Sequence, residues 1–216
     1  MFLRLSPRHG SRLLTRIYSA VAARRCPSCS APLPTALPTC PSCSHIEPLP
    51  STLSYHDIFG LPSVPNPFCV NTQTLKARFL QAQKICHPDA WSGKGKKEHD
   101  IAAAQSALLN KAYQTLLSPL QRANYILAQQ GLSESETDRL GDTELIMEVM
   151  EAREELEEAT SGEAVELARQ RNRDRINRTQ KILEKLIGER RWDDAKKAAV
   201  ELKYWETIEN AVKDLE

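Results

Sequence analysis

The chain has 216 residues, a formal net charge of +1 and 41% hydrophobic residues, which is ordinary for a globular protein of one or two modest domains. This composition excludes disorder as the main state. No apolar run approaches the roughly 18 residues that a membrane-spanning helix needs, so we expect no membrane partner.

The N-terminal segment is strongly basic, and the first acidic residue of the chain is Glu47. Arginines recur every four residues from Arg4 to Arg16, so a helix would gather them near one face. An amphipathic, arginine-rich segment without acids is typical of a mitochondrial transit peptide. The string RIYS (residues 16–19) resembles a matrix processing site, so we predict a transit peptide over 1–18 and a mitochondrial matrix location. A disordered arm that binds nucleic acid or lipid headgroups is the alternative.

Two CPSC units follow, with Cys26 and Cys29 in the first and Cys40 and Cys43 in the second. Paired C-x-x-C units at this spacing place four thiolates around one tetrahedral ion, as in a zinc knuckle. Four cysteine ligands leave no open coordination position, which indicates a structural role. For this segment, residues 19–50, we predict zinc and expect no iron–sulfur cluster. Two disulfides would be disfavoured in a reducing matrix, and a redox site would need a thioredoxin-like context.

Ten of the thirteen prolines lie between Pro27 and Pro67, which excludes regular helix there. We therefore expect metal coordination, rather than a hydrophobic core, to order this part of the chain. Cys69 and Cys86 have no partners at ligand spacing, and we expect both to be small buried apolar residues.

From residue 71 onward the pattern is helical. Asn71 can cap a helix that runs to about Cys86, and a second helix is predicted from Glu98 to Leu117. The basic, glycine-rich stretch between them, residues 90–97, is predicted to be a mobile loop. The two helices should form an antiparallel hairpin joined through the triplet His87-Pro88-Asp89.

The rest of the chain is also predicted to be helical. Ser118 and Pro119 start a helix that Gly131 ends, and a second helical block begins near Thr143. That block breaks at Ser161-Gly162 and continues as helices over about 163–190 and 193–215, for which a three-helix bundle is the natural packing. The fold class is therefore all-α, with a hairpin domain over 51–131 and a bundle over 132–216.

The triplet HPD does not have the surroundings of an active site, because its loop supplies no nucleophile and no third ligand. A rigid proline between two polar side chains, behind a helix carrying Lys76, Arg78 and Lys84, suits contact with an acidic partner surface. The alternative is a solvated turn with an incidental histidine.

The first helix of the second block belongs to an acidic region, since residues 133–159 hold eleven acids and two arginines. Its expected core stripe consists of Leu145, Val149, Ala152, Leu156 and Ala159. Apolar residues off that stripe, rimmed by carboxylates, suggest a protein-binding patch. This patch comprises Ile146, Met147, Met150, Glu151 and Glu154. Tyr204 on the last helix would join it, while Ile146 could instead pack against the hairpin domain.

Several motifs in order resemble a J domain and, more narrowly, the HscB family of J-type co-chaperones of iron–sulfur cluster assembly. They are YHDIFGL (55–61), HPD (87–89), LNKAY (109–113), LSPLQRANYIL (117–127) and IMEVMEAREEL (146–156). The resemblance covers roughly residues 53–216. The paired C-x-x-C units resemble an extra metal module of some mitochondrial members.

The resemblance implies that the chain is not an enzyme. The HPD triplet would contact a DnaK-type chaperone in its ATP state, steered by Lys76, Arg78 and Lys84, and would stimulate ATP hydrolysis by that partner. Ala90 departs from the basic residue usual in the family after the triplet. The patch on the acidic helix, with Tyr204, would bind an IscU-type scaffold on which clusters are built.

Two other classes of function are alternatives. A mitochondrial zinc-ribbon protein would bind nucleic acid through the basic N-terminus and through Arg169, Arg171, Arg173 and Arg175. The near-zero net charge and the acidic helix oppose it, so we expect no nucleic-acid partner and a solvated face for these arginines. A thiol oxidoreductase using Cys26 and Cys29 lacks the fold context of that class.

Overall fold

The computed structural model describes residues 24–133 and 143–213. Over these residues the secondary structure is helical apart from two isolated β-bridges, which confirms the all-α prediction. The elements are α1 (Tyr55–Phe59), α2 (Thr72–Cys86), the 3₁₀ turn η1 (Pro88–Trp91), α3 (Lys96–Leu117), α4 (Pro119–Gln129), α5 (Thr143–Glu157), α6 (Gly162–Gly188) and α7 (Trp192–Lys213). The predicted transit peptide lies outside the described residues. None of the helices in the described ranges is both long enough and apolar enough to cross a bilayer.

The helices begin at side chains that satisfy free backbone N–H groups. Asn71, Ser118 and Ser161 each accept a hydrogen bond from a backbone N–H in the first turn of the helix that follows. The caps at Asn71 and Ser118 were predicted, whereas Ser161 was expected only to break the chain between two helices. Ser54 caps α1, and Gly60 ends it in the left-handed conformation that glycine adopts without strain.

The hairpin of α2 and α3 closes over α1 with an apolar core. Leu75, Ala82 and Cys86 of α2 face Leu109 and Ala112 of α3 and are all buried. Cys86 is therefore the buried apolar residue that we predicted. The prediction for Cys69 was wrong, because its thiol is exposed and donates a hydrogen bond to Glu184 Oε1 at 3.2 Å.

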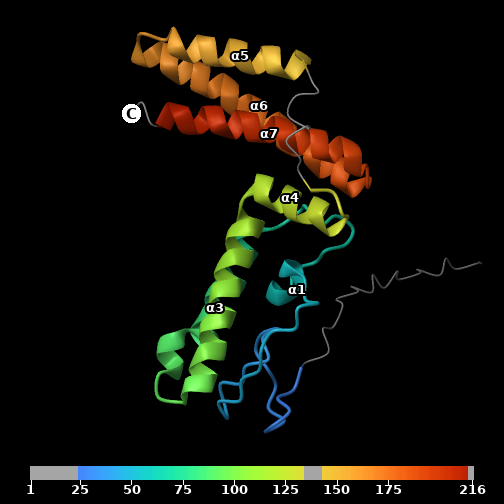
Figure 1. The fold of residues 1–216 in the computed structure, drawn as a ribbon, viewed down its shortest axis with the longest axis vertical. Helices are drawn as coiled ribbons and strands as arrows, with labels where there is room; N and C mark the ends of the chain where they lie inside the picture. Colours follow the sequence, from blue (N-terminus) through green and yellow to red (C-terminus); the bar gives the residue numbers. More distant parts are fainter. Residues whose placement is uncertain (1–23, 134–142, 214–216) are drawn as a thin grey trace, which may run out of the picture.

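The C-terminal helices α5, α6 and α7 pack on one another as the predicted three-helix bundle. Val149, Ala152 and Leu156 of α5 lie against Trp205 and Ile208 of α7, and Leu145 packs at the edge, as expected for the core stripe of the acidic helix. Ala159, the last residue of the predicted stripe, lies beyond the end of α5. The helices of the bundle run across the end of the hairpin (Figure 1).

Helix α4 joins the two blocks. Its residues Ala123 and Leu127 are buried in a core shared with Leu183 of α6 and Leu202 of α7. The core also takes Phe68 from the segment before α2. Because α4 follows α3 after a single residue, this shared core ties the hairpin to the bundle.

The N-terminal segment packs on the hairpin, which corrects our expectation that metal coordination alone would order it. Leu37, between the two CPSC units, is fully buried in the core of the hairpin. Ile46, after the second unit, is buried against Trp91. These contacts could not be predicted from the sequence, because the segment lacks the helical or strand periodicity that identifies buried positions.

A single buried arginine holds the junction of the blocks. Arg122 of α4 donates from Nε to Leu116 O at 2.8 Å, from Nη1 to Phe68 O at 2.6 Å and from Nη2 to Leu117 O at 3.3 Å. Burial lowers the pKa of its guanidinium, and the carbonyls at the C-terminus of α3 supply compensating negative potential.

Replacing this arginine should therefore destabilise the whole chain. We expect Arg122→Leu to lower the free energy of unfolding by about 3 kcal/mol, because three carbonyls lose their donor. Urea unfolding followed by circular dichroism measures this. The matched change Arg178→Leu, at an exposed position of α6, should alter stability by less than about 0.5 kcal/mol. Equal effects of the two changes would contradict the role of Arg122.

Candidate functional site

The four cysteines of the CPSC units converge on one point. Their Sγ atoms all lie within 4.8 Å of one another. Cys26 Sγ lies 3.6 Å from Cys43 Sγ, and Cys29 Sγ lies 3.7 Å from Cys40 Sγ. A tetrahedron of thiolates with metal–sulfur bonds of about 2.3 Å has edges of about 3.8 Å, so the cluster fits a bound ion.

The two units fold in the same way. Cys26 N donates to Ala31 O and Cys40 N donates to His45 O, which closes each unit into a tight turn. Ser30 and Ser44, directly after the units, both have a φ of 60°. The backbone N–H of Cys43, and further that of Ser42, lower the pKa of the Cys40 thiol to about 6. At Cys29 the backbone N–H of Ala31 also favours the thiolate, but hydrogen bonding to the neighbouring thiols, together with burial, raises its pKa. The backbone of the turns thus favours the thiolate form that binds metal, while the crowding of the four sulfur atoms opposes it.

The HPD triplet lies at the tip of the hairpin, on the turn between α2 and α3. His87 ends α2, and its Nδ1 accepts a hydrogen bond from Asp89 N at 3.3 Å. The side chains of His87 and Asp89 are 55% and 91% exposed, and Pro88 is the first residue of η1. A partner can therefore reach both polar groups without any movement of the hairpin.

The stretch after the triplet is more ordered than we predicted. Trp91 is 4% exposed, and its Nε1 donates to Ile85 O at 3.0 Å. Lys96 and Lys97 already belong to α3. The prediction of a mobile loop over residues 90–97 was therefore wrong at Trp91, Lys96 and Lys97. The glycine and lysine content of this stretch does not reveal that Trp91 is buried.

The three basic residues assigned to chaperone binding are all exposed on α2. At about 100° per residue, Lys76 and Lys84 share a stripe that leads to His87, whereas Arg78 lies on another side of the helix. Leu80 falls between the two lysines on that stripe and is 55% exposed. Sequence reasoning missed Leu80, although its spacing of four residues from each lysine was visible.

The predicted patch on α5 is exposed, on the side of the helix that faces away from the bundle core. Met147 and Met150 are 59% and 56% exposed, which is unusual for large apolar side chains. Glu151 and Glu154 are exposed on the same side of the helix, and Ile146 is half-buried. These residues form an apolar centre with an acidic rim, here called the α5 patch.

The side chain of Tyr204 is more buried than its position on the helical wheel indicates. It is half-buried and packs against the core cluster of Val149, Ala152 and Trp205. Its side chain therefore contributes to the bundle core as well as to the surface near α5.

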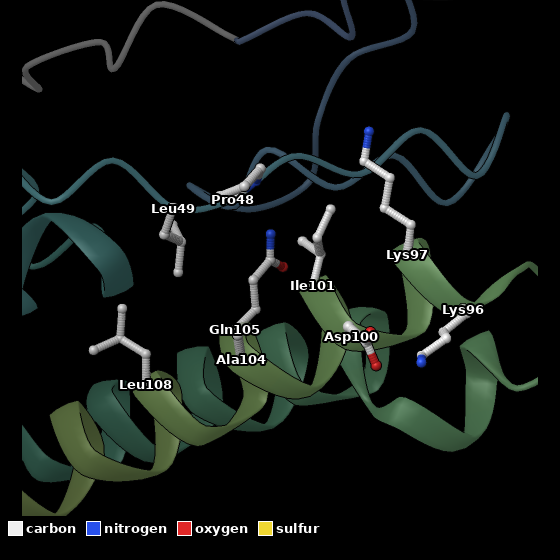
Figure 2. A pocket seen from close by; sticks show the side chains of 9 residues that line it. All are labelled: Pro48, Leu49, Lys96, Lys97, Asp100, Ile101, Ala104, Gln105 and Leu108. Carbon is white, nitrogen blue, oxygen red and sulfur yellow. The ribbon is translucent and has the colours of Figure 1, made fainter.

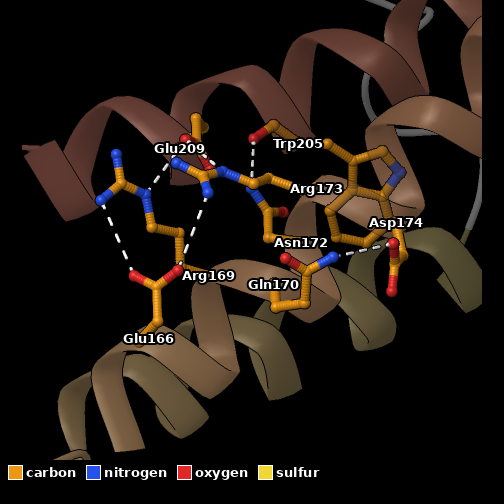
Figure 3. A network of polar contacts seen from close by, with 8 residues as sticks. All are labelled: Glu166, Arg169, Gln170, Asn172, Arg173, Asp174, Trp205 and Glu209. Carbon is orange, nitrogen blue, oxygen red and sulfur yellow. Dashed lines mark hydrogen bonds and ion pairs between the residues drawn. The ribbon is translucent and has the colours of Figure 1, made fainter. Parts of the chain in front are cut away.

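The arginines of α6 make ion pairs within the bundle, which corrects the prediction of a solvated face. Arg169 Nε and Arg173 Nε lie 3.4 and 3.3 Å from the same oxygen, Oε1 of Glu209 on α7 (Figure 3). Arg171 pairs with Glu155 of α5, and the Arg175 guanidinium lies over the Trp205 ring, 5.2 Å from its centroid. These contacts occupy the groups that a nucleic-acid binder would direct at phosphates.

Comparison with known proteins decides the family. The chain is 30% identical over 195 residues, 90% of this chain and 75% of the relative, to the iron–sulfur cluster co-chaperone protein HscB homolog of Arabidopsis thaliana. The model of the HSCB C-terminal oligomerisation domain matches residues 141–213. The chain belongs to the HscB family of co-chaperones.

Solved structures of the HscB family have the same fold. The crystal structure of human co-chaperone protein HscB aligns with a TM-score of 0.77 and 28% identity, covering 89% of this chain and 98% of that one. The Jac1 co-chaperone from Saccharomyces cerevisiae aligns with a TM-score of 0.58 and 25% identity, covering 68% of this chain and 85% of that one. The resemblance drawn from the motifs is thereby confirmed.

Proposed function

We propose that this HscB-family protein brings an IscU-type iron–sulfur scaffold to a DnaK-type chaperone and stimulates the ATPase of that chaperone. The observation that carries the proposal is the presence of two exposed docking surfaces on separate blocks, the HPD turn and the α5 patch. The name of the Arabidopsis relative supports iron–sulfur cluster assembly as the process served. The cluster is cargo on the scaffold.

The HPD turn acts on the chaperone in its ATP state. Lys76 and Lys84 on α2 attract an acidic surface, and Leu80 between them adds apolar contact. Arg78, on the far side of the helix, adds to the positive potential that steers the partner. His87, Pro88 and Asp89 then engage the partner at the hairpin tip. ATP is hydrolysed in the active site of the chaperone, so the co-chaperone breaks no bond itself.

The α5 patch binds the scaffold. Met147 and Met150 supply flexible apolar anchors, with Ile146 and Tyr204 at the border of the bundle core. Glu151 and Glu154 form the charged rim, which selects a scaffold surface with basic residues. In this proposal the J domain spans 51–131 and the scaffold-binding domain spans 132–216.

The four-cysteine site holds structural zinc. Cys26, Cys29, Cys40 and Cys43 complete a tetrahedral shell, so the ion joins the two CPSC turns and offers no open position for chemistry. The acid-free, arginine-rich N-terminus supports cleavage after residue 18 and a mitochondrial matrix location for the mature chain.

His87→Gln should abolish stimulation of the chaperone ATPase, because the imidazole at the hairpin tip is lost. Scaffold binding should be unchanged, because the α5 patch lies on the other block. The measurements are single-turnover ATP hydrolysis and calorimetric titration with scaffold. His99→Gln, at another site on the hairpin, is the control and should behave as wild type. Loss of scaffold binding in His87→Gln would contradict two separate surfaces.

Truncating the two exposed methionines should weaken scaffold binding. We expect Met147→Ala combined with Met150→Ala to cost about 2 kcal/mol of binding free energy, as measured by titration calorimetry. Leu80→Ala removes an apolar side chain of similar exposure from the hairpin and should leave scaffold affinity unchanged. An unchanged affinity in the double variant would refute the patch assignment.

Purified protein should contain about one zinc ion per chain by elemental mass spectrometry. Cys40→Ser combined with Cys43→Ser should remove it, because two thiolates cannot complete the shell. Iron in place of zinc in protein purified under anaerobic conditions would contradict the identity of the metal. A wild-type chain without any metal would refute the site.

A further inference from the structure

The four-cysteine module and the HPD turn meet in one buried cluster. Ile46, three residues after Cys43, packs with Trp91 and Ala102 of the hairpin. Their exposed fractions are 8%, 4% and 0%. Trp91 is the last residue of η1, the turn that begins with Pro88 and contains Asp89. The side chain that anchors the end of the HPD turn is therefore covered by the N-terminal module.

The HPD turn has only short-range hydrogen bonds of its own. Ala90 N donates to His87 O at 3.0 Å, Lys94 N donates to Trp91 O at 3.0 Å, and Trp91 Nε1 donates to Ile85 O. Each of these bonds joins residues close in sequence, and the indole bond ties η1 to the last turn of α2. Burial of the indole against Ala102 of α3 holds the turn from the other side, and Ile46 completes that burial from outside the J domain.

The position of Ile46 depends on the second CPSC unit. Thr39 and Ile46 flank that unit and pair through a β-bridge. Thr39 Oγ1 donates to Gln105 Oε1 at 2.7 Å, and Gln105 Nε2 donates to Glu47 O at 2.6 Å. Figure 2 shows the Gln105 side chain pointing from α3 toward the N-terminal segment. The turn between Thr39 and Ile46 carries two of the four cysteines, so an ion bound there would fix both contacts to α3.

We propose that the four-cysteine module controls the HPD turn: metal binding keeps Ile46 against Trp91, and Trp91 positions His87, Pro88 and Asp89 for the chaperone. Ile46 and Trp91 are thus positioning residues. The inference rests on the proposed function of the HPD turn and adds its regulation by metal loading. Loss of the metal uncovers Trp91 and loosens η1, while the α5 patch on the other block is unaffected.

The test uses the full chain and hydrogen–deuterium exchange of residues 85–94. Ile46→Ala, with metal content verified, should speed exchange in this segment about tenfold and reduce ATPase stimulation several-fold, without changing scaffold affinity. Ile46→Val should keep both the exchange rate of residues 85–94 and ATPase stimulation close to the wild-type values. Leu33→Ala is the matched control, because Leu33 is a half-buried residue of the same module outside the Trp91 cluster.

The metal is tested separately. Cys40→Ser combined with Cys43→Ser, or removal of the metal by a chelator, should speed exchange of residues 85–94 as Ile46→Ala does. Exchange in α6 and α7 should stay the same. This readout does not depend on any ATPase activity.

Three results for Ile46→Ala would overturn the inference. The first is unchanged exchange of residues 85–94, and the second is faster exchange with full ATPase stimulation. The third is a loss of scaffold binding as large as the loss of ATPase stimulation, because that would mark general destabilisation. A wild-type chain that fails to stimulate the chaperone refutes the proposed function instead, and the exchange data then decide separately whether the module holds the turn.

Discussion

The packing of α4 against α6 and α7 is the constraint on which the arrangement of the molecule depends. Leu127, Leu183 and Leu202 form a continuous core at the junction, and Arg122 satisfies the carbonyls that the end of α3 would leave unpaired there. The hairpin and the bundle are therefore held as two arms of one body (Figure 1). The HPD turn and the α5 patch lie on different arms, so the proposed chaperone and scaffold would not compete for one surface.

The two arms differ in charge near their proposed docking surfaces. Arg169, Arg171 and Arg173 of α6 pair with Glu209 and Glu155 of the neighbouring helices, so their positive charge is largely balanced within the bundle. The acidic side chains of α5 are left to define the bundle surface near the α5 patch, while Lys76 and Lys84 define the hairpin surface near HPD. Each arm thus favours a partner of opposite charge and disfavours the other.

Features that depend on local sequence were predictable, and features that depend on contacts between distant segments were not. Capping by Asn71 and Ser118 and the apolar stripe of α5 follow from local sequence, and the four cysteines converge as their spacing indicates. The burial of Leu37 and Trp91 could not be predicted, because a proline-rich segment and a glycine-rich turn have no period. The ion pairs of α6 depend on how far each helix is shifted along its neighbour, which a single sequence does not encode locally.

The central claim is that one chain must carry both docking surfaces. It is tested most directly by mixing two defective variants, His87→Gln and the double change of Met147 and Met150 to Ala, and measuring ATP-driven transfer of scaffold onto the chaperone. The account predicts that the mixture transfers no more scaffold than either variant alone. Recovery of transfer toward the wild-type level would contradict it, because the two surfaces would then act without being joined.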